Sequence, residues 1–233
     1  ERIEKVQINF CKRYCQLPQN VSDVFVYGEC GRLPLCTIYF KNCIKYWLKL
    51  ISMDDSRYPR QCYKMLYRLD EVGRTNWTSK VRILLCLNGF GHAWINQGVG
   101  NEFCFINMLK QRLQDCAFQN WTSKLNDSSK ADTYRGFKSL LNVERYLCID
   151  MSLKLKQVLA RFRCSSHKLQ IEKGRHTGID RSLRFCPLCQ KDQISAVESE
   201  FHFLLEYKSY QALRDTYFIN QWRNGNTLDQ FNL

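Results

Sequence analysis

Long apolar runs are missing from this sequence of 233 residues. One of the longest, residues 83–87, is far shorter than the roughly 20 apolar residues that a helix needs to cross a bilayer. Proline and glycine are scarce, with four and eleven residues, which argues against long flexible linkers and low-complexity segments. No secretory signal is recognisable, and the chain begins with glutamate rather than methionine. We therefore expect no membrane partner, and we expect the chain to be a piece of a longer protein.

Cysteine, by contrast, is abundant. The chain has 13 cysteines, an odd number, and most of them lie in segments with helix-like patterns. A disulfide-stabilised secreted domain would more typically show an even number of cysteines. Reduced thiols in an intracellular compartment fit this composition better. The sequence therefore predicts a protein of the nucleus and cytoplasm.

The hydrophobic pattern of the first 150 residues is typical of α-helices. Phe105, Leu109 and Leu113 repeat every four residues toward Trp121, which predicts a helix of about 20 residues. Strand-like alternation is scarce, so we expect a mostly α fold in which residues 1–150 form a multi-helix scaffold. Further expectations are core positions at Trp47, Leu109 and Leu113, helices over 59–72 and 77–87, and an N-cap for the second at Thr75 or Asn76.

The character of the chain changes after residue 150. Five apolar residues between positions 153 and 162 form one face of a short predicted helix, and Gly174 and Gly178 are expected to end helical structure further on. We expect a basic helix and loop at 151–185. A small metal-knuckle-like module and a C-terminal helix are expected at 186–233.

The net charge of +13 is unevenly distributed. Residues 151–190 contain nine lysines and arginines against Glu172 and Asp180, a local charge of 9 − 2 = +7. A solvated surface would spread its charge and alternate its sign, whereas clustered cations neutralise phosphates well. The distribution therefore favours RNA or DNA as a partner. The candidate contacts in this block are Arg161, Arg163, Lys168, Lys173, Arg175, Arg181 and Arg184.

A second pattern follows the basic block directly. Cys186 and Cys189 are two residues apart around Pro-Leu and can bend over one metal ion, and His202 follows thirteen residues later. In a Cys-x2-Cys-x12-His-x4-Cys pattern the fourth ligand would fall at 207, where this chain has Tyr207. Phenolate is a poor zinc ligand because its pKa of about 10 opposes deprotonation at neutral pH. We expect weak zinc binding, with a metal-free packing of both thiols as the alternative.

No constellation of catalytic residues is visible. Met53-Asp54-Asp55 is superficially like the paired aspartates of a polymerase palm, but Ser52 stands where that motif needs an aromatic residue. The pair follows an amphipathic segment, so we expect a solvated helix end. No nucleophile and base are paired in the sequence either, and we expect no catalytic centre in this chain.

Three segments together carry a resemblance to a known family. They are the block from Leu159 to Arg175 (LARFRCSSHKLQIEKGR), residues 184–189 (RFCPLC) and residues 200–206 (EFHFLLE). They resemble the C-terminal region of LINE-type (non-LTR) retrotransposon reverse transcriptases, in which an R-x-R-x-S-x-H-x-L-x-I-E-x-G-R block precedes a C-P-L-C…E-x-H-F-L-x-x-C knuckle. Upstream segments such as residues 26–35 (VYGECGRLPL) are similar to the helical region that follows the polymerase in that family.

The resemblance implies a helical linker and a zinc knuckle that grip template RNA or target DNA during target-primed reverse transcription. The parent would be an RNA-directed DNA polymerase, and its remaining chain would be a partner. Glu172 would brace an arginine, and Cys164 is a distant candidate for a substitute metal ligand. Residue by residue, the resemblance implies nucleic-acid contacts for Arg161, Arg163, His167, Lys168 and Arg175, and zinc ligation by Cys186, Cys189 and His202.

A function of another class is open at this point. A helical protein-interaction module could present the same basic face to an acidic protein partner. Binding of RNA or DNA that weakens steeply with salt would favour the nucleic-acid interpretation.

Overall fold

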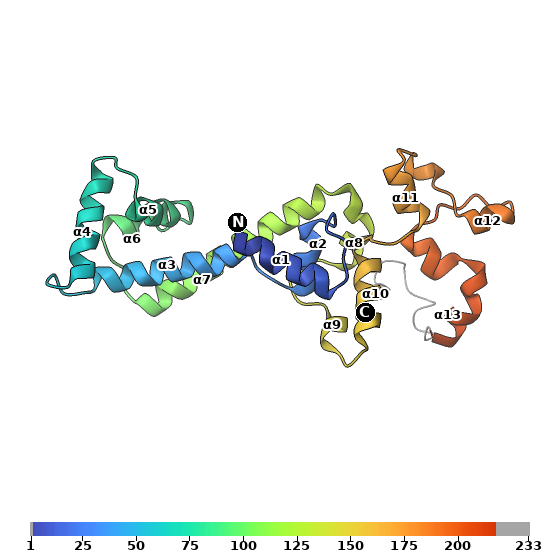
Figure 1. Cartoon of the computed structure of the whole chain (residues 1–233), viewed down its shortest axis with the longest axis horizontal. Helices are drawn as coiled ribbons and strands as arrows, with labels where there is room; N and C mark the ends of the chain where they lie inside the picture. The colour runs from blue at the N-terminus through green and yellow to red at the C-terminus, as the bar shows by residue number, and fades with distance from the viewer. Residues whose placement is uncertain (1, 218–233) are drawn as a thin grey trace. The chain divides into compact units, whose positions relative to one another are not determined.

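The structure, a computed structural model, describes residues 2–217 and is mostly helical there, which confirms the expected fold class (Figure 1). Strand pairing within this range is limited to two isolated bridges. None of the described helices combines the length and apolar character needed to span a membrane. The helices are α1 (Arg2–Tyr14), α2 (Asp23–Cys30), α3 (Leu35–Ile51), α4 (Tyr58–Glu71), α5 (Trp77–Leu87), α6 (Gly91–Ile95), α7 (Glu102–Asn126), α8 (Asp132–Phe137), α9 (Arg145–Cys148), α10 (Leu153–Arg163), α11 (Gln170–His176), α12 (Pro187–Lys191) and α13 (Gln211–Tyr217). Short helical turns are η1 (Ser129–Ala131), η2 (Arg181–Leu183), the π-helical η3 (His202–Glu206) and η4 (Lys208–Tyr210).

The chain forms two compact units whose boundary differs from the expected one at residue 150. Apart from the first three residues, one unit consists of 33–120, and the other combines 4–32 with the described residues from 121 to 217. In the second unit the Trp121 indole N–H donates to the carbonyl of Val24 at 2.9 Å, so α2 packs against the end of α7. Such pairing of distant segments leaves no trace in local composition. The part of the expected C-terminal module beyond Tyr217 lies outside the described residues.

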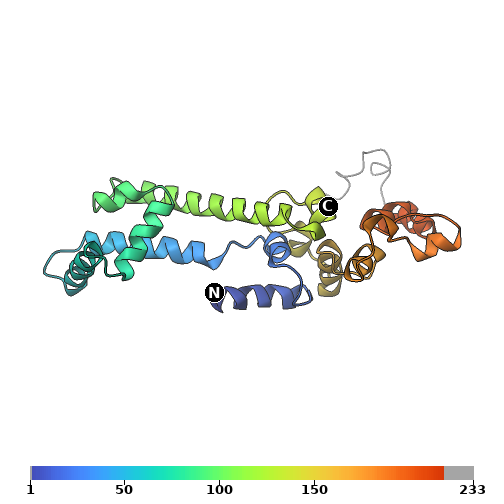
Figure 2. The ribbon, with the colours of Figure 1, turned by 90° about the horizontal axis from the view of Figure 1, so that it is seen from above.

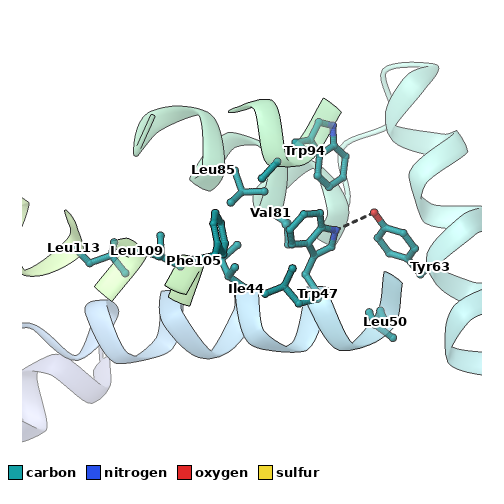
Figure 3. Packing of buried hydrophobic residues seen from close by; sticks show 12 residues of the cluster. Ile44, Trp47, Leu50, Tyr63, Val81, Leu85, Trp94, Phe105, Leu109 and Leu113 are labelled. Carbon is teal, nitrogen blue, oxygen red and sulfur yellow. Dashed lines mark hydrogen bonds between the residues drawn. The ribbon is translucent and has the colours of Figure 1, made fainter. Parts of the chain in front are cut away.

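The core of the first unit lies between α3 and the first part of α7, which run antiparallel to each other (Figure 2). Trp47 of α3 is buried, and its indole N–H donates to the Tyr63 hydroxyl of α4 at 3.0 Å (Figure 3). Leu109 and Leu113 of α7 join the same cluster. The three core positions expected from the sequence are therefore confirmed.

Local signals set the helix boundaries of this unit. The Asn76 side chain accepts from the Thr78 amide at 2.8 Å, and the Ser79 hydroxyl accepts from the Asn76 amide, a reciprocal cap that confirms Asn76 as the N-cap of α5. Asp54 and Asp55 are exposed beyond the end of α3. The expectation of a solvated helix end at this pair is therefore confirmed.

Truncation of Leu109 to alanine is expected to lower the free energy of unfolding by about 2–5 kcal/mol, because the site is fully buried and would leave a cavity. Met108→Ala is the matched control, since the side chain of Met108, next to Leu109 on α7, is 55 % exposed. Urea unfolding of both variants measures the effect. Equal midpoints for the two variants would contradict the assignment of the buried face.

Helix α10 forms where the sequence predicts it, but three of the five apolar residues expected on its buried face are exposed. Leu153, Leu155 and Val158 are 50 %, 55 % and 56 % exposed. Ser152 caps this helix by accepting from the Leu155 amide at 3.4 Å. The helix is supported by its N-cap, by its basic C-terminal turn and by the fully buried Ala160.

Gly174 does not end a helix, contrary to expectation. It lies inside α11, where a Cβ atom would approach the Cγ of Arg184 to 2.6 Å. The residue is needed for this close approach rather than for a turn. Gly178, with φ of +72°, adopts the left-handed conformation that follows the helix and fits the expected break.

Candidate metal centre and basic surface

The two cysteines of the CPLC segment lie at the start of a loop that returns on itself. The Cys186 amide donates to the Ala196 carbonyl at 2.8 Å, and the Glu198 amide donates to the Arg184 carbonyl at 2.9 Å. Phe185 and Val197 form an antiparallel bridge. These bonds close residues 184–198 into a hairpin, which we call the metal hairpin.

Within the metal hairpin a tight turn brings the two thiols to one side. Cys186 is the N-cap of α12, and Pro187 occupies the first helical position, where its missing N–H costs nothing. The helix ends after Lys191, and Gln193 has a left-handed φ of 58°. The Ile194 amide then donates to the Cys189 carbonyl at 2.9 Å, which closes the turn.

His202 completes a group of three buried ligands. The ligand atoms of Cys186, Cys189 and His202 all lie within 4.8 Å of one another, and Nε2 of His202 is 3.3 Å from Sγ of Cys189. A tetrahedral zinc ion with bonds of about 2.0–2.3 Å places neighbouring ligand atoms roughly 3.6–3.8 Å apart. The three residues can therefore hold a metal ion with small side-chain shifts. Cys164 is buried elsewhere and does not belong to this group.

The three candidate ligands are buried and have hydrogen-bond partners. Burial raises the pKa of the Cys189 thiol, and the neighbouring Cys186 thiol adds to this shift. A metal ion would have to displace this proton in order to bind. The other ring nitrogen of His202, Nδ1, lies 3.1 Å from a carboxylate oxygen of Glu206. Tyr207, at the position of the fourth ligand, has its ring centroid 6.2 Å from that of His202.

The metal hairpin is bound directly to the basic segment. Glu198 accepts from the Gln170 amide at 2.6 Å through its side chain and from the Ile171 amide at 3.1 Å through its backbone carbonyl. The Arg184 guanidinium donates to the Ile171 carbonyl at 2.7 Å. The start of α11 is therefore bonded to Arg184 and to Glu198, which lie before and after Cys186 in the sequence.

Arg163 is withdrawn from the expected nucleic-acid contacts, because its side chain is only 11 % exposed. Its guanidinium pairs with the fully buried Glu29 at 3.0 Å and with Glu144 at 2.7 Å. It also lies over the Phe137 ring, 4.2 Å from the centroid. An arginine with two carboxylate partners and an aromatic neighbour holds the fold together and presents little surface to a ligand.

His167 is also withdrawn from the expected nucleic-acid contacts, because its side chain is largely buried and has a carboxylate partner. Its Nε2 lies 2.9 Å from the carboxylate of Glu200, and both side chains are largely buried. Burial is the largest single influence and raises the pKa of Glu200, but the hydrogen bond and charge of His167, a backbone amide and the Thr133 hydroxyl together outweigh burial and lower that pKa. The Thr133 hydroxyl donates to the same carboxylate at 2.9 Å. The contacts of Glu200 with His167 and Thr133 therefore join the basic segment to the turn that carries His202.

Three more of the expected contact residues have protein partners. Arg175 pairs with Glu172 at 3.0 Å, as expected for a glutamate that braces an arginine. Arg181 pairs with Asp132 and remains half exposed. Arg184 is occupied by the backbone carbonyls of Ile171 and Ile179.

The remaining three candidates are exposed and without an ion-pair partner among the described residues. They are Arg161 in the last turn of α10, Lys168 in the following loop and Lys173 on α11. We call them the free cations. The basic segment therefore divides into arginines that organise the fold and a smaller set available to an anionic ligand.

The roles of two buried carboxylates, Glu29 and Glu200, could not be read from local sequence spacing. Glu29 lies 134 residues before its partner Arg163, and Glu200 lies 33 residues after His167. Glu172 was expected to brace an arginine, and Glu206 could have been suspected because it stands four residues after a candidate metal ligand, a spacing at which side chains meet on a helix.

Comparisons of the chain with protein families, with curated proteins and with solved structures give no significant match.

Proposed function

We propose that this chain is a nucleic-acid-binding module of a LINE-type retrotransposon reverse transcriptase, in which a zinc ion stabilises the region that carries the free cations. The observation that carries the proposal is the attachment of α11 to the metal hairpin through Glu198 and Arg184. The rest of the reverse transcriptase chain is the implied protein partner. The module itself contributes binding and no chemistry.

The donor set supports zinc as the metal. Two thiolates and one imidazole are soft and borderline ligands, which zinc accepts in a tetrahedral arrangement. The ligands Cys186, Cys189 and His202 are all buried, as in sites whose metal stabilises a fold. All thirteen cysteines are free thiols, which fits the proposed location in the reducing nucleus and cytoplasm.

The distribution of charge supports a polyanionic ligand. Arg161, Lys168 and Lys173 occupy one stretch of the second unit, with no carboxylate paired to them among residues 2–217. Unpaired cations of this kind bind phosphates favourably, because their binding releases the counterions of the nucleic acid. RNA and DNA both offer this chemistry.

Replacing all three free cations by alanine is expected to weaken binding of single-stranded RNA or DNA. Each lost phosphate contact lowers the magnitude of the slope of log K against log salt by about 0.7, so the triple variant should lose about 2 units. Fluorescence anisotropy titrations between 50 and 200 mM salt measure this slope.

The matched control removes two lysines and one arginine from the other unit. Lys80, Lys110 and Arg112 are exposed and have no ion-pair partner among the described residues, so their removal changes the net charge equally. The control variant should keep the slope of the original protein. An equal loss in both variants would show that binding follows net charge alone and would contradict this assignment of the binding surface.

A protein-interaction module is the second candidate. The observation that favours it is the exposure of the apolar Leu155 and Val158 side chains on α10, where the basic Lys154 lies one turn before Val158. An acidic amphipathic segment would satisfy both the apolar and the charged side chains of this face.

A further inference from the structure

We propose that Glu206 is a positioning residue for the metal centre: it fixes the ring of His202 so that Nε2 faces the two thiols. The inference rests on the proposed metal site and adds a residue to it. Glu206 lies outside the ligand group formed by Cys186, Cys189 and His202, and it acts through the histidine.

For a neutral imidazole, the two contacts of the ring favour one arrangement of its proton. Nδ1 of His202 is 3.1 Å from Oε2 of Glu206, while Nε2 is 3.3 Å from Sγ of Cys189. An ionised carboxylate only accepts hydrogen bonds, so Nδ1 must carry the hydrogen. A neutral imidazole then has its lone pair on Nε2, which is the atom that faces the thiols and would bind the metal.

The backbone places Glu206 where this contact requires it. Residues 202–206 form the π-helical turn η3, in which the Tyr207 amide donates to the His202 carbonyl at 2.9 Å. The wider turn still brings the side chains of residues 202 and 206 together. His202 is buried, whereas the Glu206 side chain is 54 % exposed, so the carboxylate meets the ring from the solvent side.

The size of the effect follows from this exposure. Partners that orient metal-bound histidines typically change metal affinity about 10- to 100-fold. Because solvent screens the exposed carboxylate, the lower end of that range applies, and loss of Glu206 should weaken zinc binding about tenfold. An ordinary surface ion pair would leave both zinc affinity and the imidazole tautomer unchanged.

Zinc affinity and the His202 tautomer should be measured on the full chain with Glu206→Ala and Glu206→Gln. Competition with a chelator gives the affinity, and ¹⁵N NMR of the imidazole gives the tautomer. We expect Glu206→Ala to bind zinc about tenfold more weakly and to lose the Nδ1–H tautomer in the zinc-free protein. Glu206→Gln should retain that tautomer and much of the affinity, because its amide oxygen still accepts the hydrogen bond.

Asp192→Asn is the matched control, since it removes an exposed carboxylate charge at the end of α12 without touching His202. Unchanged affinity and tautomer in Glu206→Ala, with normal zinc binding by the unmodified chain, would overturn the role of Glu206 alone. A loss equal to that of the control would reduce it to a charge effect and overturn it too. Absence of zinc from the unmodified chain would overturn the metal site together with this inference.

Discussion

Replacing Tyr207 by cysteine is expected to tighten zinc binding by about 10²–10³-fold and to raise the melting temperature only when zinc is present. A four-ligand zinc finger gains about 10–16 kcal/mol from its metal, so an average ligand accounts for about 2.5–4 kcal/mol. Tyr207 stands where the spacing calls for that ligand, and its ring lies near that of His202. Chelator competition and thermal unfolding with and without zinc measure both effects.

Tyr210→Cys is the control for this substitution. Tyr210 is also partly buried and its ring packs against that of Tyr207 at 5.0 Å, but it lies outside the ligand spacing. It should lose stability without gaining affinity for zinc. Zinc in the Tyr207→Cys protein but not in the unmodified chain would indicate that the natural chain has lost its metal. Absence of zinc from both of these proteins would refute the site.

Replacing Arg163 by methionine is expected to cost about 3–5 kcal/mol of stability, because the change leaves the carboxylates of Glu29 and Glu144 without their common partner. Glu29 is fully buried, so water cannot take over the role of the guanidinium. Urea unfolding monitored by circular dichroism gives the loss directly.

Arg161→Met provides the matched comparison two residues away on the same helix. Arg161 is exposed and has no ion-pair partner among the described residues, so its loss should change stability by less than about 0.5 kcal/mol. The affinity for nucleic acid should show the opposite order. Arg161→Met should weaken binding more than Arg163→Met, because Arg161 is one of the free cations. A stable Arg163→Met protein with weakened nucleic-acid binding would restore Arg163 to the contact surface.

Local features of the fold could be predicted from the sequence, because they depend on neighbouring residues. The N-cap at Asn76 and the buried face of α7 follow from side-chain chemistry and helical periodicity within a few residues. The division into two units could not be predicted in this way. It depends on contacts such as that of Trp121 with Val24, which no periodicity records.

The candidate site divides along the same line. The spacing of Cys186, Cys189 and His202 identified a group that the fold brings together. Positive charge alone could not tell Arg161 from Arg163, because the difference lies in a carboxylate 134 residues away. A basic residue in a charged block can therefore form an ion pair inside the fold or contact a ligand at the surface. The presence of a carboxylate partner determines which of the two it does.

Affinity for nucleic acid compared with that for an acidic polypeptide tests the central claim most directly. Labelled single-stranded RNA and DNA of matched length should be titrated with the zinc-supplemented chain, with polyglutamate of equal charge as competitor. The account predicts nucleic-acid binding that weakens steeply with salt and resists polyglutamate, because bases stack on protein side chains while phosphates pair with cations. Equal competition by polyglutamate, or no binding of either nucleic acid at low salt, would contradict it.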